Sequence, residues 1–316
     1  MSLANPAARP SVLVVGTGAM ASLFGARLAR FGKASVTLTG HWLEARLAIA
    51  SQGLRVDEPS GQWSARPDVA PLDAPHPAAD FVLVLVKTPQ TPLVATVVAR
   101  ALRPTGHAVT LQNGLGNQET LLAATGPGRV SVGVATLGAT LLAPGHVRAT
   151  PGSVALGAGP SPAPAIVRFA SLLTAAGFDT TLETDIDRLV WRKLAVNCAI
   201  NPLSALFGCP NGALLEGERR QTLIEAAHEV GAVAAAKGID LGDDPAGLAL
   251  AVAEKTAANH SSMLQDVERG ALTEIDALNG AVVREGRALG VPVPVNESLW
   301  RRVLELQARG VQGIGA

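Results

Sequence analysis

The stretch that decides the fold reads V-L-V-V-G-T-G-A-M-A-S-L-F-G and occupies residues 12–25. Its first four residues are an apolar run of the kind found in strands that are buried on both faces of a sheet. Gly16, Gly18 and Ala21 follow with the spacing G-x-G-x-x-A, and an apolar pattern of helical period continues beyond them. This order of strand, small-residue turn and helix predicts a βα unit that binds a dinucleotide.

Each small residue of the turn has a mechanical role. Gly16 allows the chain to turn tightly off the strand, Gly18 lets the backbone approach a pyrophosphate, and Ala21 allows close packing of helix on strand. The phosphates would lie at the helix N-terminus, where the N–H groups and the dipole favour negative charge. An ordinary strand–helix turn is the alternative interpretation. The residues expected to contact the cofactor here are Gly16, Thr17, Gly18, Ala19, Met20 and Ala21.

Composition limits the class of protein. The chain has 316 residues, 48% of them hydrophobic, which is enough for two domains with sizeable cores. Its 26 basic and 26 acidic residues give a net charge of zero, so neither nucleic acid nor an acidic membrane is expected as a partner. No apolar run reaches the length of a membrane span. Cys198 and Cys209 form neither a disulfide framework nor a metal-binding spacing, so we expect a cytoplasmic protein without a metal site.

The end of the second predicted strand, at residues 35–39, decides between NAD and NADP. NAD-specific sites place a carboxylate about 20 residues after the glycines, where it binds the ribose hydroxyls. Here the sequence reads T-L-T-G-H-W, and the first carboxylate is that of Glu44. A 2′-phosphate would meet no repulsion, and His41 or Arg46 could supply positive charge. The pattern favours NADPH, with His41 among its contacts; the alternative is that His41 merely begins a helix.

Apolar patterns beyond this point predict the rest of the architecture. Strands are expected at residues 35–39, 80–86, 107–111, 131–136 and 178–182, and a hairpin at 54–57 and 63–65. A strand-like stretch is also expected at 145–156, with residues 141–144 joining it to the strand at 131–136. Helices are expected at 91–102 and 165–176, and helical patterns alone follow residue 184. The expected fold is α/β, with an N-terminal Rossmann-type doubly wound sheet and an all-helical C-terminal domain. We expect an NADP-binding domain at 1–184 and a helical substrate and catalytic domain at 185–316.

Polar residues follow two of the predicted strands. Lys87 comes after the strand at 80–86, and Asn113 after the strand at 107–111. Ligands bind at the carboxyl ends of parallel strands, so we expect both side chains near the crevice that holds the Gly16 turn. A solvated lysine and a turn asparagine are equally good interpretations of the residues taken alone.

A polar stripe crosses the first helix of the second domain. Lys193, Asn197 and Asn201 lie at i, i+4 and i+8, so they share one face. A solvated face is the alternative, although such a face usually carries carboxylates, and this one has none. A lysine suits carbonyl reduction, because an ammonium can give both a proton and positive charge to the alkoxide that hydride addition creates, provided that burial lowers its pKa.

Further polar residues occur later in the chain. Asn211 lies in a turn after Pro210, and Asn259 and Ser262 belong to a polar cluster. Thr273 is expected to cap a helix and to place Glu274 in its first turn. The alternative is that Glu274 is only a carboxylate that interacts favourably with the helix dipole.

These residues together resemble the ketopantoate reductase (2-dehydropantoate 2-reductase) family over nearly the whole chain. The two long C-terminal blocks are the most specific part of the resemblance. The matching stretches are G-T-G-A-M-A at 16–21, V-K-T-P-Q-T at 86–91, L-Q-N-G-L-G at 111–116, W-R-K-L-A-V-N-C-A-I-N-P-L-S-A at 191–205, C-P-N-G at 209–212, and S-S-M-L-Q-D and T-E-I-D-A-L-N-G within 261–280.

The resemblance implies NADPH-dependent reduction of 2-dehydropantoate to (R)-pantoate, a step toward pantothenate. It implies Lys193 as proton donor, Glu274 as its partner and as a cofactor contact, and Lys87, Asn113 and Ala139 as contacts near the nicotinamide. The residues expected at the substrate, a small 2-oxo acid, are Asn113, Asn197, Asn201, Asn211, Asn259 and Ser262.

One departure from the family pattern bears on the cofactor. Many members carry an Arg directly after the second strand, whereas this chain has Thr39-Gly40-His41. Three alternatives stay open: a reductase of another 2-oxo acid, an opine-type dehydrogenase on the same fold, and a non-catalytic NADP(H)-sensing protein. The apolar helical half is also compatible with a homodimer.

Overall fold

The computed structural model describes residues 9–159 and 163–313, and these form two compact units. The sheet unit comprises the described residues within 9–86, 90–112 and 117–186. The helical unit comprises residues 87–89, 113–116 and 187–313. Two short segments that follow strands of the sheet are therefore part of the helical unit.

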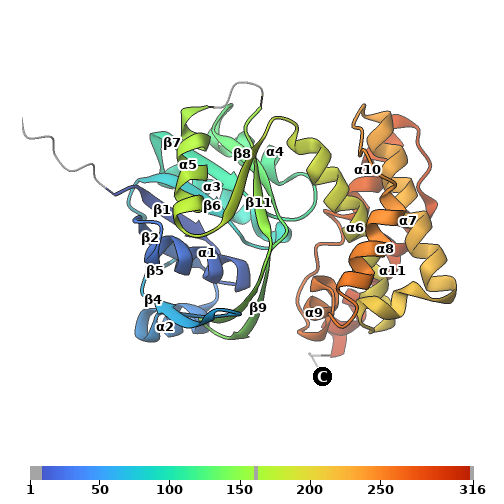
Figure 1. Cartoon of the computed structure of the whole chain (residues 1–316), viewed down its shortest axis with the longest axis horizontal. Helices are drawn as coiled ribbons and strands as arrows, with labels where there is room; N and C mark the ends of the chain where they lie inside the picture. The colour runs from blue at the N-terminus through green and yellow to red at the C-terminus, as the bar shows by residue number, and fades with distance from the viewer. Residues whose placement is uncertain (1–8, 160–162, 314–316) are drawn as a thin grey trace, which may run out of the picture. The chain divides into compact units, whose positions relative to one another are not determined.

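The sheet unit is built on an eight-stranded sheet with the order β12-β11-β8-β7-β6-β1-β2-β5. Figure 1 labels the strands of this sheet other than β12. All its pairs are parallel except β8 with β11. The strands are β1 (Ser11–Val15), β2 (Ser35–Gly40), β5 (Asp68–Pro71), β6 (Ala79–Val84), β7 (Leu102–Thr110), β8 (Val130–Ala135), β11 (Ser153–Gly157) and β12 (Asp179–Glu183). This confirms the Rossmann-type doubly wound sheet.

Helices cover both faces of this sheet. Val12 and Val14 belong to a core cluster that includes residues of α1 and α5, whereas Leu13 and Val15 belong to a cluster with residues of α3 and α4. The apolar run of β1 is thus buried on alternate faces, which explains its lack of polar residues. The helices of this part are α1 (Ala19–Arg30), α2 (Leu43–Gln52), α3 (Thr91–Ala101), α4 (Asn117–Thr125) and α5 (Pro164–Ala175). The short helix η1 (Thr88–Gln90) has its first two residues in the helical unit.

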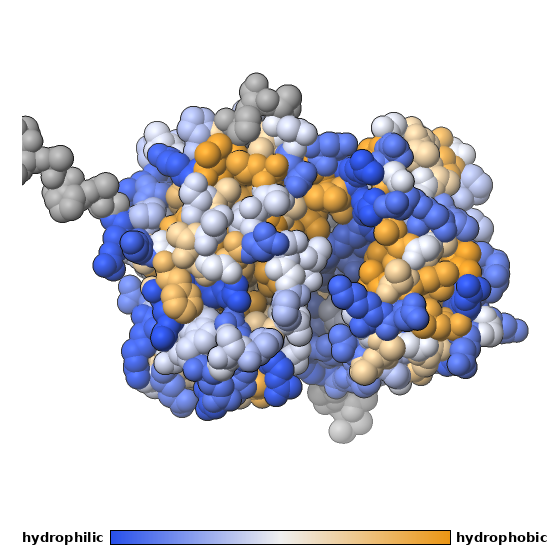
Figure 2. Space-filling view, viewed as in Figure 1, coloured by the Kyte–Doolittle hydropathy of each residue, from blue (hydrophilic) through white to orange (hydrophobic). Residues whose placement is uncertain are grey.

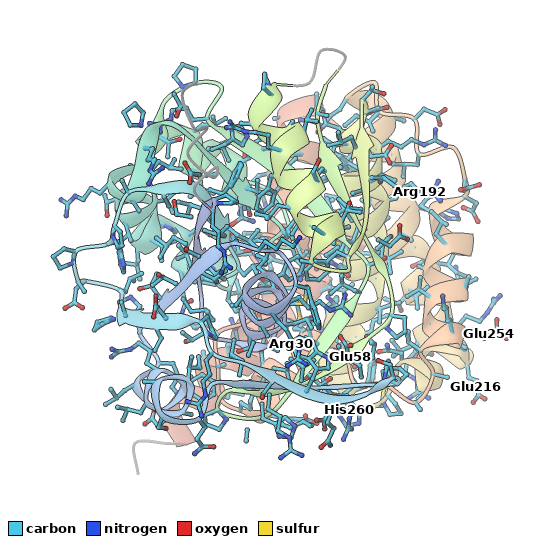
Figure 3. All side chains as sticks on the ribbon, turned by 60° about the vertical axis from the view of Figure 1, so that its left-hand side comes forward. Arg30, Glu58, Arg192, Glu216, Glu254 and His260 are labelled. Atoms are coloured by element: carbon cyan, nitrogen blue, oxygen red, sulfur yellow. The ribbon has the colours of Figure 1, made fainter. Side chains whose placement is uncertain are left out.

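A smaller four-stranded sheet has the order β4-β3-β10-β9. Its strands are β3 (Leu54–Glu58), β4 (Gly61–Ala65), β9 (Gly138–Ala143) and β10 (His146–Thr150). The β3–β4 pair confirms the expected hairpin. Trp63 of β4 donates a hydrogen bond to Glu58 at 3.0 Å, and the Arg30 guanidinium of α1 lies 5.5 Å from the Trp63 ring centre; Figure 3 labels Arg30 and Glu58. These contacts pack α1 on the small sheet.

The expectation for residues 141–156 was wrong in two respects. Residues 141–143 are part of β9 rather than a connection, and 145–156 contains two strands, β10 and β11, in different sheets. Pro144 and Gly145 form the turn between β9 and β10, with Gly145 at a φ of 75°. Strand β10 ends before Pro151, which cannot donate to a ladder, so the apolar pattern continues while the chain changes sheet.

The helical unit confirms the all-helical character of the C-terminal part, because no strand follows β12 in the described residues. Its longest helix, α6 (Ile186–Phe207), contains Pro202. The others are η2 (Asn211–Leu215), α7 (Gly217–Ala236), α8 (Pro245–Lys255), α9 (Ser262–Glu268), α10 (Asn279–Leu289) and α11 (Pro294–Gly313). Within the described ranges, no helix has the length and apolar character needed to cross a membrane. Polar residues are interspersed with apolar ones over the face shown in Figure 2.

We predict that Gly16→Ala destabilises the protein, whereas Gly18→Ala does not. Gly16 has a φ of 134°, and a Cβ there would lie 3.0 Å from the carbonyl oxygen of Leu85. Gly18 has a φ of −80°, and a Cβ there meets no atom within 4 Å. Strain of this kind costs on the order of 1–3 kcal/mol. Thermal unfolding of both variants measures the difference; equal midpoints would contradict it.

Candidate active site

The small-residue turn lies at the point where the strand order of the large sheet reverses. β1 pairs with β2 on one side and with β6 on the other. The Gly16 N–H donates to the Thr39 carbonyl at 2.7 Å, and α1 begins at Ala19 without a side-chain cap. Ala21 is fully buried, and a Cβ added at Gly16 would lie 3.1 Å from the Cβ of Ala21. The turn therefore has the geometry of a phosphate-binding loop at a switch point.

No carboxylate stands directly at the end of β2; His41 follows the strand, and Glu44 and Arg46 lie near the start of α2. His41 is exposed, and α2 begins two residues later behind Trp42, which provides no side-chain cap. Arg46 lies in the first turn of α2, and its Nε is buried with no hydrogen-bond partner among the described residues. A buried guanidinium nitrogen without an acceptor suits an anionic ligand group at this helix N-terminus.

Glu274 is the centre of the polar site in the helical unit. Its side chain is buried, and Oε1 accepts from the Thr88 backbone N–H at 3.1 Å and from Thr88 Oγ1 at 3.2 Å. Oε2 accepts from Asn113 Nδ2 at 3.0 Å. Thr88 Oγ1 also lies 2.9 Å from the Asn113 carbonyl oxygen. One carboxylate therefore organises the segments that follow β6 and β7.

Lys193 on α6 is electrostatically coupled to this carboxylate. Burial lowers the pKa of Lys193 from its ordinary value to about 8, while the negative charge of Glu274 acts in the opposite direction. Asn197 is half-buried on the same helix, and Asn201 is buried, with its carbonyl 3.4 Å from Ser261 Oγ. The stripe on α6 is thus not a fully solvated face.

The helix expected to begin at Glu274 begins instead at Asn279. Residues 274–278 form a turn, and Thr273 Oγ1 accepts from the Ile275 N–H at 3.3 Å. The Ala277 carbonyl accepts from the Leu115 N–H at 3.0 Å, and the Leu278 N–H donates to the Glu274 carbonyl at 3.1 Å. The turn at 275–278 separates Glu274 from α10, so Glu274 precedes the helix rather than lying in its first turn.

The remaining candidates differ in exposure. Asn211 is buried, and its Nδ2 donates to Thr256 Oγ1 at 2.9 Å, while its backbone N–H donates to the Asn259 carbonyl at 3.0 Å. Asn259 and Ser262 have exposed side chains, with Ser262 at the start of α9. Ala139 lies on β9 of the sheet unit.

Two residues of the polar site were not identified from the sequence. Thr88 holds Glu274, and the buried Asp266 lies 2.6 Å from Lys87 Nζ through its Oδ2. Thr88 stands in the V-K-T-P-Q-T stretch and Asp266 in S-S-M-L-Q-D, but their partners are 186 and 179 positions away. The neighbouring sequence does not indicate which polar residue in each stretch contacts such a distant partner.

The arrangement is suited to proton transfer. It combines an ammonium of lowered pKa, a buried carboxylate and neutral amides, which are the groups that a carbonyl reduction needs beside a hydride donor. No group of three or more potential metal ligands is present in the part of the chain that the structure describes.

Comparison with known proteins gives matches over most of the chain. The family model described as "Ketopantoate reductase PanE/ApbA" matches residues 12–161, and "Ketopantoate reductase PanE/ApbA C terminal" matches residues 185–307. The 2-dehydropantoate 2-reductase of Halobacterium salinarum is 38% identical to this chain over 293 residues, which cover 91% of this chain and 96% of the relative.

Solved structures share the fold. The PanE/ApbA family ketopantoate reductase of Ralstonia eutropha is 31% identical, with a TM-score of 0.86 and coverage of 95% of this chain and 99% of that chain. A ternary structure of D-mandelate dehydrogenase with NADH and anilino(oxo)acetate has a TM-score of 0.88 with the same coverage. At 23% identity, the second likeness establishes a common fold alone.

We predict that Glu274→Gln lowers the pKa of Lys193 below about 8, because the charge of Glu274 is the influence that raises it. Glu285→Gln is the matched control, since Glu285 pairs with Lys237 at 2.5 Å. An NMR pH titration of lysine side-chain carbons measures both variants. An unchanged Lys193 titration in Glu274→Gln would contradict the coupling.

Proposed function

The chain belongs to the ketopantoate reductase family and is an oxidoreductase, and we propose that it reduces 2-dehydropantoate to (R)-pantoate with NADPH. The observation that carries this proposal is the coupling of Lys193 to the buried Glu274. A non-catalytic sensor of NADP(H) has no need of an ammonium whose pKa is lowered toward neutrality.

Lys193 is the proposed proton donor. When bound, NADPH would supply the hydride for the C2 carbonyl carbon of the 2-oxo acid and would leave as NADP⁺. The π electrons of the carbonyl move to its oxygen, and Lys193 Nζ gives that oxygen a proton and becomes a neutral amine. Solvent then restores the proton. Glu274 keeps the ammonium protonated at neutral pH, because its negative charge opposes the effect of burial on the pKa.

Uncharged polar groups are proposed to orient the substrate. Amides and a hydroxyl bind a carboxylate and a hydroxymethyl group without placing further charge beside Lys193. The proposed substrate contacts are Asn113, Asn197, Asn201, Asn211, Asn259 and Ser262. We also propose the division of labour expected from the sequence, with cofactor binding in residues 1–184 and substrate binding and catalysis in 185–316.

NADPH is the proposed cofactor because the end of β2 offers positive charge to a 2′-phosphate. Arg46 Nε is buried without an acceptor in the described structure, and His41, exposed, precedes it in sequence between β2 and α2. The proposed contacts are Gly16, Thr17, Gly18, Ala19, Met20, Ala21, His41, Lys87, Asn113, Ala139 and Glu274.

The substrate and cofactor are tested together in one assay. We expect faster oxidation of NADPH with 2-dehydropantoate than with 2-oxo acids that lack its hydroxymethyl arm, and a lower KM for NADPH than for NADH. A preference for another 2-oxo acid would assign a different substrate to the same chemistry. No reduction of any 2-oxo acid would contradict the proposed function.

Lys193→Ala should lower kcat by at least about 10²-fold, the usual scale of general acid catalysis, with little change in NADPH affinity. The control is Lys255→Ala, which makes the same change at an exposed position of α8. Unchanged turnover in Lys193→Ala would remove the assigned role.

The pH dependence follows from the same residue. The ammonium is the active form of a proton donor, and its pKa is about 8. Turnover should therefore be constant below pH 8 and fall about tenfold per unit above it, as for loss of one essential proton. A kcat profile at saturating substrate measures this; constant turnover up to pH 10, near the ordinary lysine pKa of about 10.4, would show that the donor is another group.

A further inference from the structure

The proposed reaction gives no role to the buried carboxylate of Asp266. Asp266 on α9 has a side chain that is 3% exposed. Its Oδ2 lies 2.6 Å from Lys87 Nζ, and its Oδ1 lies 3.0 Å from Arg269 Nη2. A carboxylate in such a position is costly unless it is paired and hydrogen-bonded, and it has two cations. Packing alone would be served as well by an apolar residue.

The lysine that Asp266 holds stands next to the proposed reaction centre. Lys87 immediately precedes Thr88, whose N–H and hydroxyl both bind Glu274. It also follows β6 at the carboxyl end of a parallel strand, where this class of fold binds ligands. Its side chain is 40% exposed, so the ammonium is fixed on one side and accessible on the other.

The charges of this cluster do not cancel. Lys87 and Arg269 contribute two positive charges and Asp266 one negative charge, which leaves one net positive charge on the three residues. A lysine paired with a single aspartate would be neutral toward an anion. With Arg269 present, the Lys87 ammonium stays attractive to anionic oxygen while its position is fixed.

We propose that Asp266 is a positioning residue, which fixes the Lys87 ammonium so that it meets an anionic oxygen of the bound ligands. This inference rests on the proposed function. The oxygen belongs either to the carboxylate of the 2-oxo acid or to a phosphate of the dinucleotide, because both present the same chemistry to an ammonium. A lysine side chain loses considerable rotamer freedom when it binds, and a buried carboxylate removes that freedom beforehand.

The test uses the full-length protein and the variants Asp266→Asn, Lys87→Met and their combination. Three quantities are measured for each: the Kd of NADPH without substrate, the KM and kcat for the 2-oxo acid, and the thermal midpoint. We expect Asp266→Asn to raise one of the two affinity constants about tenfold, the scale of one charge-assisted hydrogen bond, while kcat changes less. A change in the Kd of NADPH assigns the oxygen to the dinucleotide; a change in KM alone assigns it to the 2-oxo acid.

Two comparisons separate positioning from a structural role. If Asp266 acts through Lys87, the double variant binds the affected ligand as tightly as Lys87→Met does. The conservative variant Asp266→Glu should then retain most of the wild-type affinity. Glu268→Gln is the matched control on α9, since Glu268 is exposed and pairs with His260, which is labelled in Figure 3. It should change neither constant.

Three results would overturn the inference. The first is unchanged affinity in Asp266→Asn, whether or not its thermal midpoint falls. The second is full additivity of the Asp266 and Lys87 effects. The third concerns a wild-type protein that reduces no 2-oxo acid, in which case the proposed function fails by itself. The Kd of NADPH then tests the inference alone, and an unchanged Kd in Asp266→Asn excludes the positioning role.

Discussion

The buried carboxylate of Glu274 is the constraint on which the polar site depends. A carboxylate that is 5% exposed is stable only if its charge is balanced and its oxygens accept hydrogen bonds. Thr88 and Asn113 donate hydrogen bonds to its two oxygens, and the positive charge of Lys193 interacts with its negative charge. These groups come from three separate stretches of sequence, so the demand of one buried charge brings them together. A change to the charge of Glu274 should therefore affect Thr88, Asn113 and Lys193 together.

Lys193 shows why two opposing influences are needed at one residue. Burial alone would favour the neutral amine, which cannot donate a proton as an acid. The negative charge of Glu274 limits that shift, and the resulting pKa is about 8. The ammonium is then protonated near neutral pH yet is a stronger acid than an exposed lysine, whose pKa is about 10.4. Amides rather than carboxylates continue the stripe at Asn197 and Asn201, which keeps Glu274 as the charge that sets this balance.

What the sequence could predict was set by local constraints. The β1 run and the Gly16 turn were identifiable because burial on two faces and a positive φ restrict residue types at each position. The shared face of Lys193 and Asn197 follows from helical period alone. Long-range contacts could not be predicted: Asp266 lies 2.6 Å from Lys87 across 179 positions, and the Leu115 N–H donates to the Ala277 carbonyl just before α10.

The departure from the family pattern after β2 has a steric counterpart in the structure. A Cβ at Gly40 would lie 2.9 Å from Thr17 Oγ1, so the Thr17 side chain occupies the space that a larger residue at position 40 would need. A larger residue at position 40 would therefore require the Thr17 side chain to move. Arg46 avoids this conflict, because it lies one turn into α2 and its Nε is already buried without an acceptor in the described structure. For the proposed NADPH site, Thr17 and a larger residue at position 40 would compete for the same space, whereas Arg46 offers its positive charge from α2 without that conflict.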